Sequence, residues 1–127
     1  MNKKILIVDD EAHIRLLLHQ TLEDFEDEGV EIITAENGRD GLELIQSERP
    51  GIVFLDVMMP YMNGYEVCKE VKQDPLLDDV VIILLTAKGQ EVDKEKGLEA
   101  GADLYMSKPF DPDLIISKVS EVMQIDV

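Results

Sequence analysis

The sequence predicts an α/β fold, a doubly wound and five-stranded parallel sheet with helices on both of its faces. Five short apolar runs, rich in β-branched residues, alternate along the chain with segments whose apolar residues recur at helical spacing. The connections between them are short, and no repeat or low-complexity tract interrupts the alternation. Such alternation is typical of parallel strands joined by right-handed helical crossovers. A length of 127 residues suits a single domain, expected here over 1–127.

The first strand is expected over residues 4–8 (KILIV), because a continuous apolar run is typical of a parallel strand that is buried on both faces. Two acidic residues, Asp9 and Asp10, end this run. From Ala12 the apolar residues recur every three to four positions, which predicts an amphipathic helix. The acidic segment 24–28 and the glycine after it end the helix.

The second strand is expected over residues 30–35. Asn37 is a common residue at the start of a helix, and the helix that it begins must stop before Pro50. A third apolar run, 52–55, forms the next strand, and Asp56 follows it directly.

A loop over 57–62 leads to the third helix. Asn63 and Glu66 have the spacing of a capping box, so the helix should begin there, and Asp74 with the proline after it should end it. The longest apolar stretch, 80–85, is the fourth expected strand.

The last third of the chain contains a helix, a strand and a helix. The helix expected over 91–100 has few apolar residues among many charged ones, so it should pack lightly and move easily. The fifth strand is expected over 102–106, with Lys108 shortly after it. Asp111 begins the last helix, with Pro112 in its first turn.

Charged or hydroxyl-bearing residues follow four of the five expected strands. These residues are Asp9, Asp10, Asp56, Thr86 and Lys108. Ligands of doubly wound sheets bind outside the carboxyl ends of the strands, where the winding reverses. We therefore expect these side chains to stand at one edge of the sheet, close enough to interact.

Three carboxylates at one place repel each other unless a proton or a hard divalent cation offsets their charge. Mg²⁺ fits best, since it prefers oxygen ligands and leaves room for a phosphate, and Asp10 and Asp56 would hold it. Lys108 and Thr86 are suited to phosphate oxygens. A carboxylate in this setting can attack phosphorus, and Asp56, alone at the end of the central strand, is the best-placed nucleophile.

Each of these residues also has an ordinary interpretation. Asp9 and Asp10 could start a helix, Lys108 could be a surface charge beside a rigid turn, and Thr86 could bond its own backbone. The single cysteine, Cys68, is expected to be a small core residue, and it excludes an internal disulfide. The set of strand-end residues, taken together, favours the functional interpretation.

The charge of the chain disfavours some partners. Twelve Lys and Arg residues against 28 Asp and Glu give a net charge of −16, so direct nucleic-acid binding is not expected. The first apolar run is too short for a secretory signal, and the longest is too short to cross a bilayer. We expect a cytoplasmic protein without membrane contacts, whose partners are proteins.

Four segments resemble the receiver domain of two-component response regulators, over essentially the full length of the chain. They are ILIVDDE at 5–11, FLDVMMPYMNGYE at 54–66, IILLTAKG at 82–89 and GADLYMSKPF at 101–110. The resemblance implies a flavodoxin-like fold with the strand order 2-1-3-4-5. It also implies a signalling switch in a phosphorelay, whose only chemistry is on itself.

By this resemblance, Asp56 accepts a phosphoryl group from a phosphohistidine on a sensor histidine kinase or a histidine phosphotransfer protein. Mg²⁺ is bound directly by Asp10, Asp56 and the backbone carbonyl of Met58, while Asp9 acts mainly through water. No other cofactor is implied.

The resemblance also assigns a switch. Lys108 pairs with the phosphoryl oxygens, next to a cis peptide bond to Pro109, while Thr86 and Tyr105 change conformation together. Tyr105 could instead be an ordinary strand residue with its hydroxyl in water. The output surface would be the fourth helix, fifth strand and last helix, which would control a protein partner or effector domain, as a monomer or a phosphorylation-dependent dimer.

Two other functions share parts of this pattern. A Mg²⁺-dependent phosphohydrolase with an aspartate nucleophile uses similar residues, but here the first strand ends in adjacent acids rather than Asp-x-Asp, and no insertion is long enough to cap a substrate. A flavin-binding module has a similar topology, but the loop after the first strand is acidic where a flavin phosphate needs hydroxyls and free amides.

Overall fold

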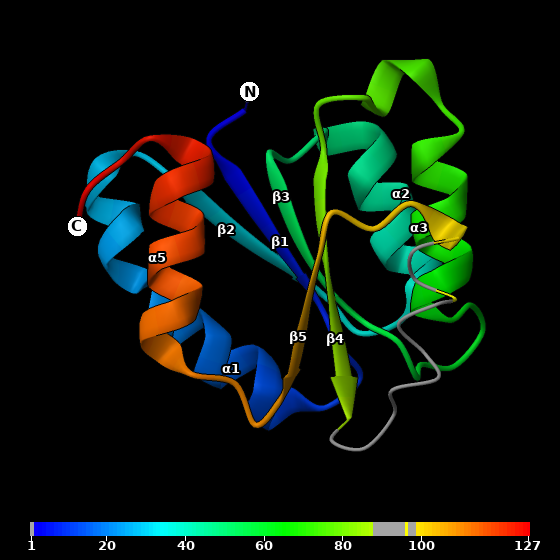
Figure 1. Ribbon diagram of the computed structural model, residues 1–127, viewed down its shortest axis with the longest axis horizontal. Helices are drawn as coiled ribbons and strands as arrows, with labels where there is room; N and C mark the ends of the chain where they lie inside the picture. The colour runs from blue at the N-terminus through cyan, green and yellow to red at the C-terminus, as the bar shows by residue number, and fades with distance from the viewer. Residues whose placement is uncertain (1, 88–95, 97–98) are drawn as a thin grey trace.

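The computed structural model describes residues 2–87, 96 and 99–127. Its centre is a five-stranded sheet in the order β2-β1-β3-β4-β5, with every neighbouring pair parallel (Figure 1). The strands are β1 (Lys4–Val8), β2 (Glu31–Ala35), β3 (Ile52–Asp56), β4 (Val81–Ala87) and β5 (Leu104–Lys108). The strand order confirms the doubly wound fold expected from the sequence.

Helices cover both faces of the sheet. The described helices are α1 (Ala12–Leu22), α2 (Gly38–Glu48), α3 (Gly64–Lys72) and α5 (Pro112–Met123), with 3-10 turns η1 (Glu23–Glu28) and η2 (Pro75–Leu77). Figure 1 shows α1 and α5 on one face and α2 and α3 on the other. No helix in the described parts of the chain is long and apolar enough to cross a membrane.

The core forms two layers, one on each face of the sheet. In β1, Leu6 and Val8 pack toward α2 and α3, while Ile5 and Ile7 pack toward α1 and α5. Because both faces are covered, all five residues of β3 are buried. This burial explains why the strands appear in the sequence as continuous apolar runs rather than as alternating ones.

Side chains cap the helices where the sequence predicts that they begin. Asn37 accepts a hydrogen bond from the backbone amide of Asp40 at the start of α2. Asn63 and Glu66 form the complete capping box of α3, each side chain accepting from the other's amide. The side chain of Asp111 accepts a hydrogen bond from the backbone amide of Asp113 at the start of α5, which has proline in its first turn. These caps satisfy amide groups that have no partner within the helix.

The structure corrects several element boundaries. The fifth strand is Leu104–Lys108, so the prediction of 102–106 was wrong by two residues, and β4 continues beyond residue 85 to Ala87. Parallel pairing of Thr86 with Ser107 and of Ala87 with Lys108 extends both strands beyond the apolar run. An apolar pattern marks the buried part of a strand, whereas backbone pairing sets its end.

A further difference concerns the end of α1. The acidic segment 24–28 is not the end of α1 but belongs to η1, whose Phe25 is fully buried. Gly29 then adopts a φ of 86°, a left-handed conformation that glycine tolerates best. Of the helix expected over 91–100, only residues 96, 99 and 100 are described, and these three are helical.

Candidate functional site

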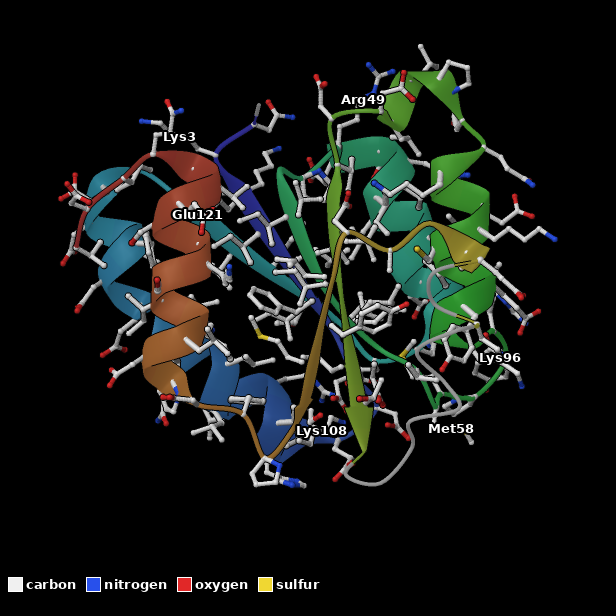
Figure 2. All side chains as sticks on the ribbon, in the orientation of Figure 1. Lys3, Arg49, Met58, Lys96, Lys108 and Glu121 are labelled. Carbon is white, nitrogen blue, oxygen red and sulfur yellow. The ribbon has the colours of Figure 1, made fainter. Side chains whose placement is uncertain are left out.

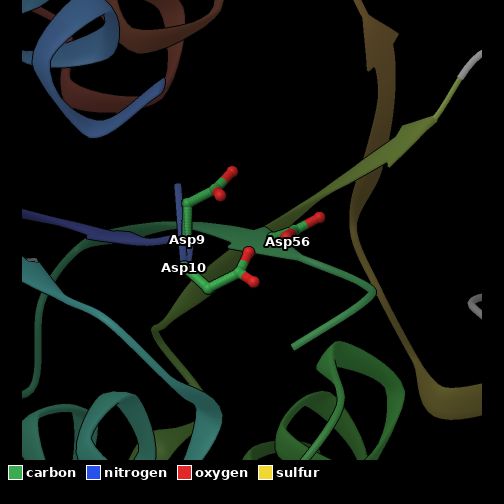
Figure 3. A group of neighbouring side chains, drawn as sticks. All are labelled: Asp9, Asp10 and Asp56. Carbon is green, nitrogen blue, oxygen red and sulfur yellow. The ribbon is translucent and has the colours of Figure 1, made fainter. Parts of the chain in front are cut away.

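Three carboxylates meet where β1 and β3 end. Asp9 and Asp10 follow the last residue of β1, and Asp56 is the last residue of β3. The two strands are hydrogen-bonded neighbours, which brings their carboxyl ends together. One carboxylate oxygen from each of the three residues lies within 4.8 Å of the others (Figure 3). The expected gathering of these acids at one edge of the sheet is therefore present.

The three carboxylates differ in their exposure to solvent. Asp9 is fully buried and Asp56 is 6% exposed, whereas Asp10 is exposed. Oδ1 of Asp9 accepts a hydrogen bond from the backbone amide of Glu11 at 2.9 Å. Such partners are required because a buried carboxylate loses its hydration. The acidic pocket, as we name the place where these three side chains meet, therefore has two buried carboxylates and one exposed carboxylate.

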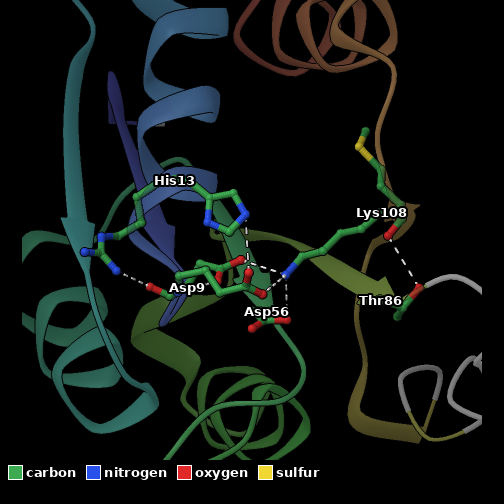
Figure 4. A network of polar contacts seen from close by, with 8 residues as sticks. Asp9, His13, Asp56, Thr86 and Lys108 are labelled. Atoms are coloured by element: carbon green, nitrogen blue, oxygen red, sulfur yellow. Dashed lines mark hydrogen bonds and ion pairs between the residues drawn. The ribbon is translucent and has the colours of Figure 1, made fainter.

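Lys108 reaches this pocket from the end of β5. Its Nζ donates to Oδ2 of Asp9 at 2.9 Å and to Oδ1 of Asp56 at 3.2 Å (Figure 4). A third carboxylate oxygen, Oε1 of Glu11, lies 3.9 Å from the same nitrogen. The peptide bond between Lys108 and Pro109 is cis, as the resemblance implies. One ammonium group thus joins the two most buried carboxylates.

The charges of the pocket shift its protonation equilibria. Burial, together with the nearby charge of Asp9, raises the pKa of Asp56 from 3.8 to about 6, although Lys108 acts in the opposite direction. Burial alone would lower the pKa of Lys108, but its hydrogen bond to Asp9 and the charge of Asp56 raise it above 10.5. The lysine therefore stays protonated at neutral pH.

Thr86 and Tyr105 lie on the strands next to the pocket. Thr86 is buried, and its Oγ1 donates to the backbone carbonyl of Met106 at 3.5 Å, across to β5. Figure 4 shows this hydroxyl on the far side of Lys108 from Asp9. Tyr105 is half-buried and packs against the core layer under α3. This half-burial agrees with an ordinary amphipathic strand residue as well as with a switch residue, so the switch role of Tyr105 stays a prediction.

The loop after β3 contributes Met58, whose side chain is 66% exposed. Figure 2 shows Met58 and Lys108 near the same edge of the sheet and Arg49 at the opposite end. A Cβ on Gly64 would collide with the backbone carbonyl oxygen of Asp56, so only glycine lets α3 begin directly against the end of β3. This close approach fixes the course of the loop, and metal binding by the Met58 carbonyl stays a prediction.

Two residues of the site were not anticipated from the sequence. Arg15 donates through Nη1 to the backbone carbonyl of Asp9 at 2.7 Å, and Glu11 lies between Lys108 and His13, whose Nε2 is 3.3 Å from Oε2 of Glu11. The sequence did contain a signal for Glu11, because it is the third acid in the run that begins at Asp9. No sequence pattern identifies an arginine that binds a backbone carbonyl.

Comparison with known proteins matches this geometry to a family. A model of the response regulator receiver domain matches residues 5–120. The alkaline phosphatase synthesis transcriptional regulatory protein PhoP of Bacillus subtilis is 45% identical over 98% of this chain and 50% of its own length. The phosphate regulon transcriptional regulatory protein PhoB of Pseudomonas aeruginosa is 41% identical over 98% of this chain and 53% of its own length. The chain thus spans about half the length of these curated relatives.

Solved structures have the same fold. A response regulator from Chloroflexus aurantiacus superposes with a TM-score of 0.85 at 34% identity, covering 96% of this chain and 98% of its own. The chemotaxis response regulator CheY4 of Vibrio cholerae gives a TM-score of 0.81 at 34% identity, covering 94% of this chain and 97% of its own. With the family match over most of its length, the chain belongs to the receiver domain family of two-component response regulators.

Proposed function

We propose that this receiver domain, taken as one domain over residues 1–127, accepts a phosphoryl group on Asp56 in a Mg²⁺-dependent reaction. The observation that carries the proposal is the position of Asp56 in the pocket. It is a nearly buried carboxylate that lies beside two others and bonds to the ammonium group of Lys108. The reaction changes the domain itself, which makes it a signalling switch rather than an enzyme acting on a separate substrate.

The donor set of the pocket suits Mg²⁺. All three side chains in the acidic cluster offer carboxylate oxygens, and one oxygen of each lies within 4.8 Å of the others. Mg²⁺ prefers oxygen ligands and usually binds one or two carboxylates while keeping several waters. We assign direct binding to Asp10, Asp56 and the carbonyl of Met58, with Asp9 acting through water. When bound, the cation offsets the negative charge that would otherwise repel a phosphate.

The donor is a phosphohistidine on a sensor histidine kinase or a histidine phosphotransfer protein. A carboxylate oxygen of Asp56 forms a bond to phosphorus while the P–N bond to the donor's imidazole breaks. The electron pair of that bond returns to the imidazole nitrogen, which takes up a proton from water. Lys108 can turn toward a phosphoryl oxygen while it keeps its bond to Asp9, because its Nζ already lies between Asp9 and Asp56.

The switch begins at Thr86. Its hydroxyl, now bonded to the carbonyl of Met106, would exchange that bond for one to a phosphoryl oxygen. This exchange would move the end of β4 and change the packing of Tyr105 on the neighbouring strand. The surface that changes comprises β5, α5 and the expected fourth helix, which lies largely outside the described residues.

The partner that reads this surface is a downstream protein or an effector domain. The two curated relatives, PhoP and PhoB, are transcriptional regulatory proteins, and this chain covers about half the length of each. We propose that this segment regulates without touching nucleic acid, because its net charge of −16 repels phosphates. Phosphorylation would either expose this surface on a monomer or favour a dimer.

Two observations disfavour the phosphohydrolase alternative. Asp9 and Asp10 are adjacent, and the pocket is part of a domain whose family match is to receiver domains.

Phosphotransfer from a small donor tests the proposal. The native chain, Asp56→Asn and the matched control Asp79→Asn, an exposed aspartate not among the residues of the acidic cluster, are incubated with acetyl phosphate and Mg²⁺. Intact mass should show one added phosphoryl group on the native chain and on Asp79→Asn, and none on Asp56→Asn or in EDTA. Donor turnover that survives Asp56→Asn would contradict the switch and support a phosphohydrolase.

A further inference from the structure

Arg15, in the first turns of α1, is bonded to the peptide group that joins the two aspartates after β1. Its Nη1 donates to the carbonyl oxygen of Asp9 at 2.7 Å. Its Nη2 lies 3.4 Å from Oε1 of Glu36, in the loop after β2. Only 17% of its side chain is exposed, which is low for an arginine on a helix. The guanidinium group therefore connects α1 to two loops at the edge of the sheet that holds the pocket.

The bond from Arg15 to the carbonyl of Asp9 affects the orientation of Asp10, the next residue. The carbonyl of Asp9 and the amide of Asp10 belong to one planar peptide group. Because Arg15 holds that oxygen, it fixes the orientation of this peptide plane, which leads directly to the Cα atom that carries the Asp10 side chain. Two other hydrogen bonds hold Asp9 itself. Its backbone amide donates to the carbonyl of Ala35 at 3.2 Å, and its Oδ1 accepts from the amide of Glu11.

We infer that Arg15 is a positioning residue of the cation site, one that orients Asp10 toward Asp56 without touching the metal. The inference depends on the proposed Mg²⁺ site. Asp10 needs such support more than its neighbours do, because it is the exposed member of the acidic cluster and no hydrogen bond or ion pair from another described residue holds its carboxylate. Groups that orient metal ligands typically change metal affinity by about 10- to 100-fold when they are removed.

The sign of the effect separates positioning from simple electrostatics. Arg15 carries a positive charge close to the acidic cluster, so its charge alone disfavours a cation there. If charge were its only contribution, neutralising it would tighten Mg²⁺ binding. If it positions Asp10, neutralising it weakens binding despite the loss of repulsion.

Calorimetric titration with Mg²⁺ alone, without phosphate, decides between these two results. Arg15→Gln should bind Mg²⁺ about tenfold more weakly than the native chain. Glu36→Gln removes only the exposed partner of Arg15 and should stay within about threefold of native affinity. Arg49→Gln, which removes an exposed arginine at the opposite end of the sheet (Figure 2), should bind as the native chain does.

Native or tighter binding by Arg15→Gln would overturn the inference. If Arg15→Gln does not fold, as judged by circular dichroism, Arg15→Lys keeps the charge but loses the planar fork of the guanidinium. Weaker binding by Arg15→Lys then supports positioning, and unchanged binding overturns it. Failure of the native chain itself to bind Mg²⁺ would instead overturn the metal site of the proposed function, and the inference with it.

Discussion

Replacing Asp56 with asparagine should stabilise the domain in the absence of divalent cations. The folded chain holds this carboxylate only 6% exposed and next to the charge of Asp9. Burial, and to a smaller extent the charge of Asp9, raises the pKa of Asp56 from 3.8 to about 6, even though Lys108 favours the charged form. Asparagine has nearly the same shape and no charge, so the variant removes the unfavourable ionisation and weakens the bond from Lys108.

The size of the effect follows from the two pKa values. A pKa that rises from 3.8 to about 6 corresponds to roughly 3 kcal/mol of differential stability between the protonated and ionised states. Below the unfolded pKa the carboxyl is protonated in both states and makes no difference. As the pH rises through this window the unfolded chain ionises first, so the folded state loses stability until the folded pKa is passed. Above that pH the full penalty applies.

At pH 7.5 in EDTA, Asp56→Asn should therefore be more stable than the native chain, by between about 1 and 3 kcal/mol once the weaker bond to Lys108 is allowed for. Urea unfolding followed by circular dichroism from pH 4.5 to 7.5 measures this difference, which should shrink as the pH falls. Asp79→Asn, at an exposed position, is the matched control and should show no such pH dependence. A variant less stable than the native chain at pH 7.5 would show that the ion pair with Lys108 outweighs the cost of burying the Asp56 carboxylate.

Three further predictions follow from the same geometry. Lys108→Ala should destabilise the domain by roughly 3 kcal/mol at pH 7.5 in urea unfolding, because it leaves two buried carboxylates without their cation; the loss should diminish toward pH 5, where Asp56 takes up a proton. Its matched comparison is the exposed Lys69→Ala, and equal losses for the two variants would contradict this account. Gly64→Ala should lower the free energy of unfolding by about 1–3 kcal/mol and weaken Mg²⁺ binding, because the added Cβ would displace the end of β3. An unchanged urea midpoint would show that the loop after β3 accommodates the Cβ without cost. Thr86→Ala should accept phosphate from acetyl phosphate as fully as the native chain by intact mass, but lose the accompanying change in tyrosine near-ultraviolet circular dichroism; retention of that change would exclude the hydroxyl as its trigger.

The fold could be predicted where local chemistry determines it. The run 4–8 became β1 because burial on both faces demands continuous apolar residues, and Asn63 with Glu66 began α3 because a capping box satisfies free amides. The end of β5 could not be predicted this way. Ser107 and Lys108 are polar, and they belong to the strand because they pair with β4.

Strand order and side-chain partners lie beyond such patterns. The periodicity of five similar apolar runs does not give the full order of the strands, which came from the family resemblance. The proximity of Asp9, Asp56 and Lys108 could be predicted, because parallel strands place their carboxyl ends at one edge of the sheet. The bond of Arg15 could not be predicted from the sequence, because its partner is a backbone carbonyl, a group that every residue carries.

Mapping the modified residue shows whether Asp56 is the phosphoryl acceptor. The chain is phosphorylated with acetyl phosphate and Mg²⁺, reduced with borohydride, which converts an aspartyl phosphate to homoserine, and digested for peptide mass spectrometry. Homoserine is expected at position 56, in Mg²⁺ and not in EDTA. Homoserine at position 9 or 10, or modification that is independent of Mg²⁺, would show that Asp56 is not the Mg²⁺-dependent acceptor.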